Sequence, residues 1–232
     1  MTGVEKSDAE TSYEQTKARF YSADDAAIYS RKHGGNARDL REQRCIAAAM
    51  TACALTPDSH VLDLPCGAGR LSPMIVDAGH RLVAADSSPN MVSEAEKAWQ
   101  EWSANDAARR ARVTFEVRDV MATGYADDTF DLIICNRLLH HFTEPATRTR
   151  ALAELRRISK RYIIASFFNA GALDARRKKL GQMITGRVQT KRVPIKVAQF
   201  TVDAAAAGLR IAHEYRTRGV ISPQMYVLLE RV

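Results

Sequence analysis

The sequence lacks the features of secreted, membrane-spanning and zinc-binding proteins. Its four cysteines, Cys45, Cys53, Cys66 and Cys135, form neither a CxxC pair nor any other zinc-ligand spacing, which predicts reduced, buried thiols and no metal site. No apolar run approaches the roughly 18 residues that a membrane span needs, and the polar N-terminus contains no apolar signal core. We therefore expect a cytoplasmic protein with no membrane insertion.

Acidic residues are missing from one stretch of the chain. Between Ala175 and Val202 there is no Asp or Glu, whereas eight Lys and Arg residues occur there. The whole chain has 34 basic and 27 acidic residues, so without those eight the remainder holds 26 basic residues and is nearly neutral. The positive charge is therefore local and indicates one cationic surface. The stretch does not interleave aromatic with basic residues, which argues against RNA stacking.

Strand and helix patterns alternate over most of the chain, which at 232 residues is long enough for one full hydrophobic core. Helices are expected at 89–103, at 146–159 and through 204–207, and another follows a glycine-rich turn. The expected strands are 60–64, 81–86, 112–119, 129–136, 161–168, 209–216 and 224–232. This order predicts an α/β fold with a doubly wound, mostly parallel seven-stranded sheet, in which the last hairpin adds one antiparallel strand.

The glycine-rich turn "PCGAG", residues 65–69, directly follows a predicted strand that contains Asp63. Ligands of open parallel sheets bind at the carboxyl ends of the strands, where Asp86, Asp119 and Asn136 are also expected. Asp86 follows Gly69 by 17 residues, a position from which an acid can bind both ribose hydroxyls. Asp119 could accept a hydrogen bond from an adenine amino group. The turn and these side chains therefore predict a nucleoside-containing ligand.

The same turn argues against a nicotinamide dinucleotide. The third glycine of a GxGxxG turn is replaced by Ser72, and the Asp63 carboxylate would repel a pyrophosphate but attract an ammonium or sulfonium group. We expect Gly67 and Gly69 to leave room for the backbone to approach the ligand. Two structural alternatives stay open: the turn amides alone could satisfy Asp63, and Asp86 could serve only to cap the helix that begins near Pro89.

Four motifs follow one another along the chain: "VLDLPCGAGRL", then Asp86 with the "SSPNM" that follows it, then "RDV", and last "FDLIICNRLLHHF". Together they resemble the class I S-adenosylmethionine-dependent methyltransferases over roughly residues 40–232. The resemblance implies S-adenosylmethionine as cofactor and S-adenosylhomocysteine as product.

The resemblance also implies roles for single residues. Asp63 and the turn would face the methionine part, and Asp86 would hold the ribose. Met91 would pack on the adenine unless it is only a core side chain, Asp119 and Val120 would clamp the adenine edge, and Asn136 would lie near the methyl group. The implied cofactor-binding residues are Asp63, Pro65, Cys66, Gly67, Ala68, Gly69, Asp86, Ser87, Met91, Asp119, Val120 and Asn136.

His140 and His141, just past the fourth predicted strand, are the candidates for a general base. The alternative is that they belong to a structural stretch and that one of them packs near the cofactor. Methyl transfer from a sulfonium can proceed by placement of the acceptor alone, so a base is not required.

The resemblance implies an enzyme that methylates a small-molecule or glycan-like acceptor on O, N or C, an anionic acceptor being one option. The alternatives are an RNA- or protein-modifying methyltransferase that docks through the basic 175–202 segment, and a non-catalytic protein that binds S-adenosylmethionine. Residues 1–55 are expected to form an N-terminal helical lid. Residues 56–232 are expected to form the S-adenosylmethionine-binding methyltransferase domain, with a basic cover insertion at about 170–199.

Overall fold

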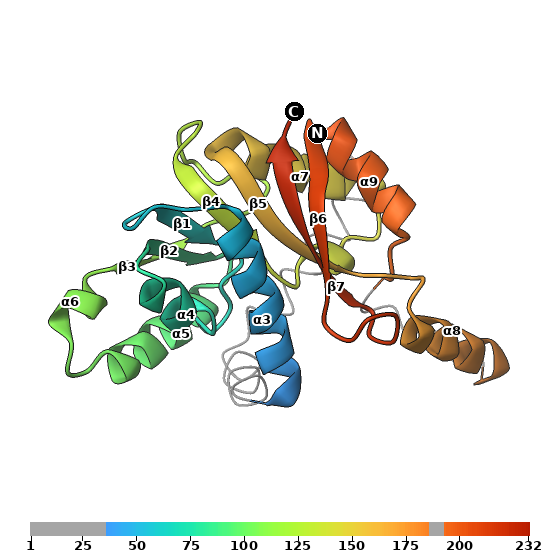
Figure 1. Ribbon diagram of the computed structural model, residues 1–232, viewed down its shortest axis with the longest axis horizontal. Helices are drawn as coiled ribbons and strands as arrows, with labels where there is room; N and C mark the ends of the chain where they lie inside the picture. Colours follow the sequence, from blue (N-terminus) through green and yellow to red (C-terminus); the bar gives the residue numbers. More distant parts are fainter. Residues whose placement is uncertain (1–35, 186–192) are drawn as a thin grey trace, which may run out of the picture.

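The computed structural model describes residues 36–185 and 193–232 (Figure 1). The expected lid up to residue 35 and part of the basic segment, 186–192, therefore lie outside the described residues. The described elements are α3 (Ala37–Ala52), β1 (His60–Asp63), α4 (Ser72–Asp77), β2 (Arg81–Asp86), α5 (Pro89–Trp102), α6 (Ala107–Arg110), β3 (Val113–Val117), β4 (Phe130–Cys135), the 3-10 turn η1 (Leu139–His141), α7 (Pro145–Ile158), β5 (Ser159–Phe168), α8 (Leu173–Thr185), α9 (Val197–Ala206), β6 (Leu209–Arg216) and β7 (Gln224–Arg231).

The strands form one seven-stranded sheet in the order β3-β2-β1-β4-β5-β7-β6. β1 to β5 pair in parallel, whereas β7 is antiparallel to both of its neighbours, β5 and β6. This confirms the predicted doubly wound sheet with one antiparallel strand from the last hairpin. The order reverses between β1 and β4, so the edge of the sheet beside these two strands is the expected place for a ligand.

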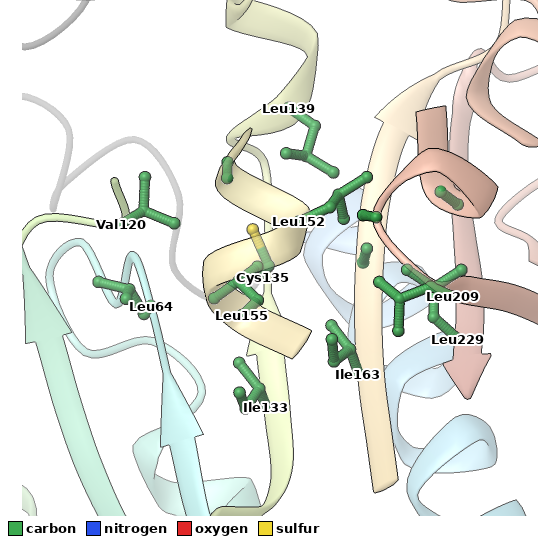
Figure 2. Close-up of a cluster of buried hydrophobic side chains, with 14 of the residues drawn as sticks. Leu64, Val120, Ile133, Cys135, Leu139, Leu152, Leu155, Ile163, Leu209 and Leu229 are labelled. Carbon is green, nitrogen blue, oxygen red and sulfur yellow. The ribbon is translucent and has the colours of Figure 1, made fainter. Parts of the chain in front are cut away.

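Helices cover both faces of the sheet (Figure 1). Apolar residues of α3, α4 and α5 pack on one face, which we call the α3 face, and residues of α7 and α9 pack on the other. Successive strand residues alternate between these layers: in β4, Ile134 belongs to the α3 face, whereas Ile133 and Cys135 pack toward α7 (Figure 2). This burial on both faces explains why β1 and β4 are almost continuously apolar.

Helix α3 begins at Asn36, whose side-chain oxygen accepts hydrogen bonds from the backbone N–H groups of Arg38 and Asp39. Its buried face starts with two acidic residues, Asp39 and Glu42, and continues with apolar ones. The acidic end of α3 therefore lies buried against the body of the protein.

The basic segment is partly helical in the structure. Part of it forms helix α8, which extends away from the sheet with Arg176, Arg177, Lys178 and Lys179 exposed (Figure 1). Helix α9 begins at residue 197 and is longer than predicted, because Phe200 packs into the core one turn before Ala204. None of the helices in the described part of the chain is both long and apolar enough to cross a membrane. All four cysteines are buried free thiols.

Candidate functional site

The predicted polar residues lie along the carboxyl edge of the parallel strands. Asp63 ends β1 and is paired in register with Ala84 of β2 and Ile134 of β4. Asp86 ends β2, and Asn136 directly follows β4. Because alternate residues of a strand share a face, Asp63, Ile134 and Asn136 lie on the α3 face. The sheet thus brings together side chains that lie up to 73 positions apart in the sequence.

The glycine turn is held by hydrogen bonds from its backbone N–H groups to β2. The Cys66 N–H donates to the Ala85 carbonyl (2.7 Å), and the Gly67 N–H donates to Asp86 Oδ2 (3.0 Å). Gly67 and Gly69 have positive φ values of 54° and 73°, which favour glycine. A Cβ on Gly69 would lie 3.0 Å from the Cβ of Ala95 in α5. The missing Cβ at Gly69 therefore makes room for a helix of the same chain, and the approach of the turn backbone to a ligand stays a prediction.

A comparison of two glycines tests this packing role. Gly69 and Gly79 both have positive φ, but a Cβ on Gly79 would meet nothing within 4 Å among the described residues. We expect Gly69→Ala to lower the free energy of unfolding by about 1–3 kcal/mol more than Gly79→Ala, because only the former also overpacks α5. Urea unfolding of both variants measures the difference. Equal losses would show that the conformational strain alone matters.

Asp63 is the most unusual side chain of this edge. It is 1% exposed, and in the described part of the chain neither of its carboxylate oxygens has a hydrogen-bond partner. Burial raises the pKa of Asp63 to about 8; the nearby Arg70 charge opposes this rise and Asp86 adds to it. An unpaired buried carboxyl group is unfavourable on its own. The turn amides therefore do not satisfy Asp63 as one alternative supposed, and its carboxyl group has no hydrogen-bond partner among the described residues.

Asp86, in contrast, is fully involved in local structure. Its Oδ2 accepts from Gly67 and its Oδ1 accepts from the Ser88 N–H (2.9 Å), while burial raises its pKa and these bonds oppose the rise. Through these two hydrogen bonds the Asp86 carboxylate connects the glycine turn to Ser88, the N-cap of α5. Each carboxylate oxygen keeps a second lone pair, so the binding of a ribose hydroxyl stays a compatible prediction.

The remaining predicted residues lie in the turn itself or follow the ends of β2 and β3. Met91 in the first turn of α5 and Val120 after β3 are buried, and Asp119 Oδ1 accepts from the Met121 N–H (2.9 Å). Pro65, Ala68 and Ser87 are half-buried at the surface of the turn. All of them border the edge on which the cofactor is expected.

The two candidate bases lie in η1. The His140 ring is buried and stacks on Phe168 at the end of β5, with ring centroids 4.0 Å apart and planes at 9°. His141 is half-buried, with its ring 4.5 Å from that of His140. His140 therefore has the packing role that the structural alternative proposed, and this stacking fixes its ring at the edge of the sheet.

A buried ionic cluster at the same edge was not predicted from the sequence. Glu42 of α3 is fully buried, and its carboxylate contacts Arg137 after β4 (2.7 Å), Arg70 after the glycine turn (3.6 Å) and the partly exposed Arg38 (3.0 Å). Burial alone would raise the pKa of Glu42, but the hydrogen bond and charge of Arg137, with the charges of Arg70 and Arg38, lower it. Asp39 also pairs with Arg70. The only signal in the sequence is an acidic residue on the buried side of an amphipathic helix.

The cluster continues into the sheet. The Tyr226 hydroxyl of β7 is within hydrogen-bonding distance of Glu42 Oε2 (3.2 Å) and of Asn136 Oδ1 (3.1 Å). Ser166 of β5 donates to the same Asn136 oxygen (3.1 Å) and accepts from the Arg137 N–H (2.8 Å). Arg137 has a φ of 58°, a left-handed conformation that is unfavourable for a residue with a side chain. This backbone conformation accompanies the contact of the Arg137 guanidinium with Glu42, while Ser166 and Tyr226 hold the Asn136 side chain.

Among the described residues, no group of three or more His, Cys, Asp or Glu side chains is arranged to hold a metal ion. The site therefore consists of an unpaired buried acid, a glycine turn, a ring-stacked histidine and a polar network. These groups can bind a cationic, nucleoside-containing ligand and orient a second molecule beside it.

Known proteins match this region. A family model described as a methyltransferase domain matches residues 61–161, from β1 into β5. The magnesium-protoporphyrin O-methyltransferase of Synechocystis is 30% identical over 148 residues, which cover 63% of this chain and 60% of that protein. The ubiquinone biosynthesis O-methyltransferase of Parvibaculum lavamentivorans is 26% identical over 179 residues, 74% of this chain and 68% of that protein. Against two other curated relatives, the match spans about half of the relative's length.

The fold also matches a solved structure over nearly its whole length. The crystal structure of the Synechocystis magnesium protoporphyrin IX methyltransferase with bound S-adenosylhomocysteine superimposes with a TM-score of 0.75 at 22% identity, covering 95% of this chain and all of that one. α3 and the β6–β7 hairpin, which lie outside the family model, are thus part of a shared architecture. Residues 61–161 thus match a methyltransferase domain, and nearly the whole chain shares its fold with a methyltransferase that was crystallised with S-adenosylhomocysteine.

Proposed function

We propose that this protein binds S-adenosylmethionine at the glycine turn and transfers its methyl group to a small-molecule acceptor. The observation that carries the proposal is Asp63, a buried acid whose oxygens have no hydrogen-bond partner among the described residues. An ammonium group would supply the missing partner, and S-adenosylmethionine carries one beside its sulfonium. The named relatives support a small acceptor, because their printed names refer to ubiquinone biosynthesis and to magnesium-protoporphyrin.

The residues at the edge fit this cofactor. Asp63 and the turn would hold the methionine part, Asp86 the ribose, and Met91, Asp119 and Val120 the adenine. When bound, the cofactor supplies an activated methyl group on sulfur. Asn136, held by Ser166 and Tyr226, would border the place where the acceptor meets that group.

The protein's own contribution to the reaction is placement and proton removal. Alignment of the acceptor can supply on the order of 7–11 kcal/mol in well-oriented systems. Where the acceptor is a hydroxyl, His140 or His141 would take its proton, a contribution of about 10²–10⁴-fold. The stack with Phe168 holds His140 in one orientation, which suits both roles.

The alternatives draw less support from the structure. Docking of RNA or protein through α8 would use four exposed basic side chains of a helix that extends away from the sheet (Figure 1). A binding protein without turnover would have no need for an ordered histidine beside the acceptor position. We also propose that the protein works in the cytoplasm, where its four free thiols would stay reduced.

Calorimetric titration with S-adenosylhomocysteine between pH 6 and pH 9.5 tests the cofactor assignment. Asp63 must lose its proton to pair with the ligand, and with a pKa of about 8 it does so less readily as the pH falls. The α-ammonium group of the ligand loses its charge only at higher pH, because the neighbouring carboxylate stabilises it. We therefore expect an affinity that rises from pH 6 through pH 8 and falls again at more alkaline pH, with an affinity at pH 6 that is lower by about tenfold or more.

Two outcomes contradict parts of this proposal. If the folded protein binds no S-adenosylhomocysteine at any pH, the cofactor assignment is wrong. If it binds with an affinity that is constant between pH 6 and pH 8, Asp63 does not pair with the ligand ammonium.

A further inference from the structure

Gln224 is a second buried polar side chain that the structure leaves unpaired. It is 1% exposed, and neither the oxygen nor the nitrogen of its side-chain amide has a hydrogen-bond partner among the described residues. Its backbone is fully engaged, since its N–H donates to Ser222 Oγ (3.3 Å) and its carbonyl accepts from Thr217 Oγ1 (3.2 Å). The backbone N–H and C=O groups of Gln224 are thus hydrogen-bonded, whereas its side-chain amide has no partner among the described residues.

Gln224 is located beside the proposed reaction centre. It is the first residue of β7 and pairs in register with Phe168, the last residue of β5. It lies two positions before Tyr226, so both side chains are on the α3 face. Tyr226 contacts Asn136, and Phe168 stacks on His140. The amide therefore lies on the acceptor side of the site, next to a flat aromatic wall.

A glutamine is an unfavourable choice for this position unless something binds it. A buried amide without partners destabilises the fold, whereas an apolar side chain of the same size would be neutral or stabilising. The neighbouring β7 residues 225–229 are all apolar or, as Tyr226, hydrogen-bonded. The retained amide indicates a ligand that supplies both a donor and an acceptor.

We propose that Gln224 recognises the methyl acceptor, and that the acceptor is a flat ring with a hydroxyl next to a second oxygen substituent. The hydroxyl donates to the amide oxygen of Gln224, and the neighbouring oxygen accepts from its amide nitrogen. A bare carboxylate has no donor and satisfies only half of the amide. This inference rests on the proposed function, since it assigns the substrate class of the same site.

The experiment measures binding of catechol to the complex with S-adenosylhomocysteine by calorimetry, for the wild type and for Gln224→Met. We expect the variant to bind catechol about tenfold more weakly or worse and to bind S-adenosylhomocysteine unchanged. The wild type should reject 1,2-dimethoxybenzene, which has no donor, whereas the variant should not distinguish the two probes. Gln100→Met replaces an exposed glutamine of α5 and should change nothing.

Thermal unfolding separates recognition from a structural role. Because Gln224→Met removes an unpaired buried amide, we expect its melting temperature to rise by about 2–4 °C or more. A lower melting temperature would mean that the amide has a structural partner and would overturn the proposal. Catechol affinity that is absent in the wild type, or equal in wild type and variant, would also overturn it. Failure to bind S-adenosylhomocysteine would instead refute the proposed function itself.

Discussion

Asp63→Asn is expected to weaken S-adenosylhomocysteine binding by about 10- to 100-fold, because a hydrogen bond to a charged group contributes about 1.5–3 kcal/mol. The amide has nearly the shape of the carboxylate but cannot provide the negative charge that an ammonium requires. The acidic limb of the pH dependence should disappear as well, since the group that titrates there is gone. Calorimetry at pH 6 and pH 8 measures both effects.

The same substitution should stabilise the protein without ligand. Asp63 has a pKa of about 8 in the folded state, far above its ordinary value of 3.8. Between these two pH values the folded state holds a proton that the unfolded state has released, so the stability of the wild type falls as the pH rises. An asparagine side chain does not titrate and would have no such loss. We therefore expect the melting temperature of the variant to exceed that of the wild type by an amount that grows from pH 4 to pH 8.

Asp77→Asn is the matched control, because Asp77 is a half-exposed aspartate of α4 that pairs only at the surface with Arg109 (3.2 Å) among the described residues. Asp77→Asn should alter neither the affinity for S-adenosylhomocysteine nor the pH dependence of that affinity. Unchanged affinity in Asp63→Asn would show that the cofactor does not use this acid, and reduced stability would show that the carboxyl group has a partner in the folded protein.

Glu42→Gln should produce the largest loss of stability among the substitutions considered. It removes the carboxylate between two guanidinium groups, Arg70 and Arg137, whose side chains are only 15% and 12% exposed. Loss of one partner from a buried ion pair costs about 3–5 kcal/mol, which corresponds to a fall in melting temperature of roughly 6–20 °C for a chain of this size. Differential scanning calorimetry at pH 7 measures this fall.

Arg38→Ala provides the comparison within the same cluster. Arg38 also contacts Glu42, but the Arg38 side chain is 52% exposed. Its removal should therefore lower the free energy of unfolding by less than about 1 kcal/mol. Because the pKa of Glu42 is held below 4.5, the contribution of the cluster persists above that pH and is lost only as the pH falls through the lowered value. Equal effects of the two substitutions would contradict a buried ionic core at this position.

Much of the architecture could be predicted from local sequence alone. Apolar alternation identified the seven strands, Ser88 and Pro89 marked the start of α5, and the glycine turn identified the edge that holds Asp63 and Asp86. These features depend on residues that are neighbours in the chain, so short sequence patterns are enough to predict them. The full length of α9 was not predicted, because it depends on the packing of Phe200 in the core. The helix within the basic segment was not predicted either, because its helical pattern in the sequence is weak.

Which polar groups are paired was decided only by the tertiary structure. Asp63 and Glu42 are both buried acids, yet the first has no described partner, whereas the second contacts Arg137, 95 residues away in the sequence. Gln224 lies next to Phe168 because β7 inserts beside β5. Burial and partnership of a charged or polar group depend on contacts between distant segments, and those contacts determine whether the group stabilises the fold or awaits a ligand.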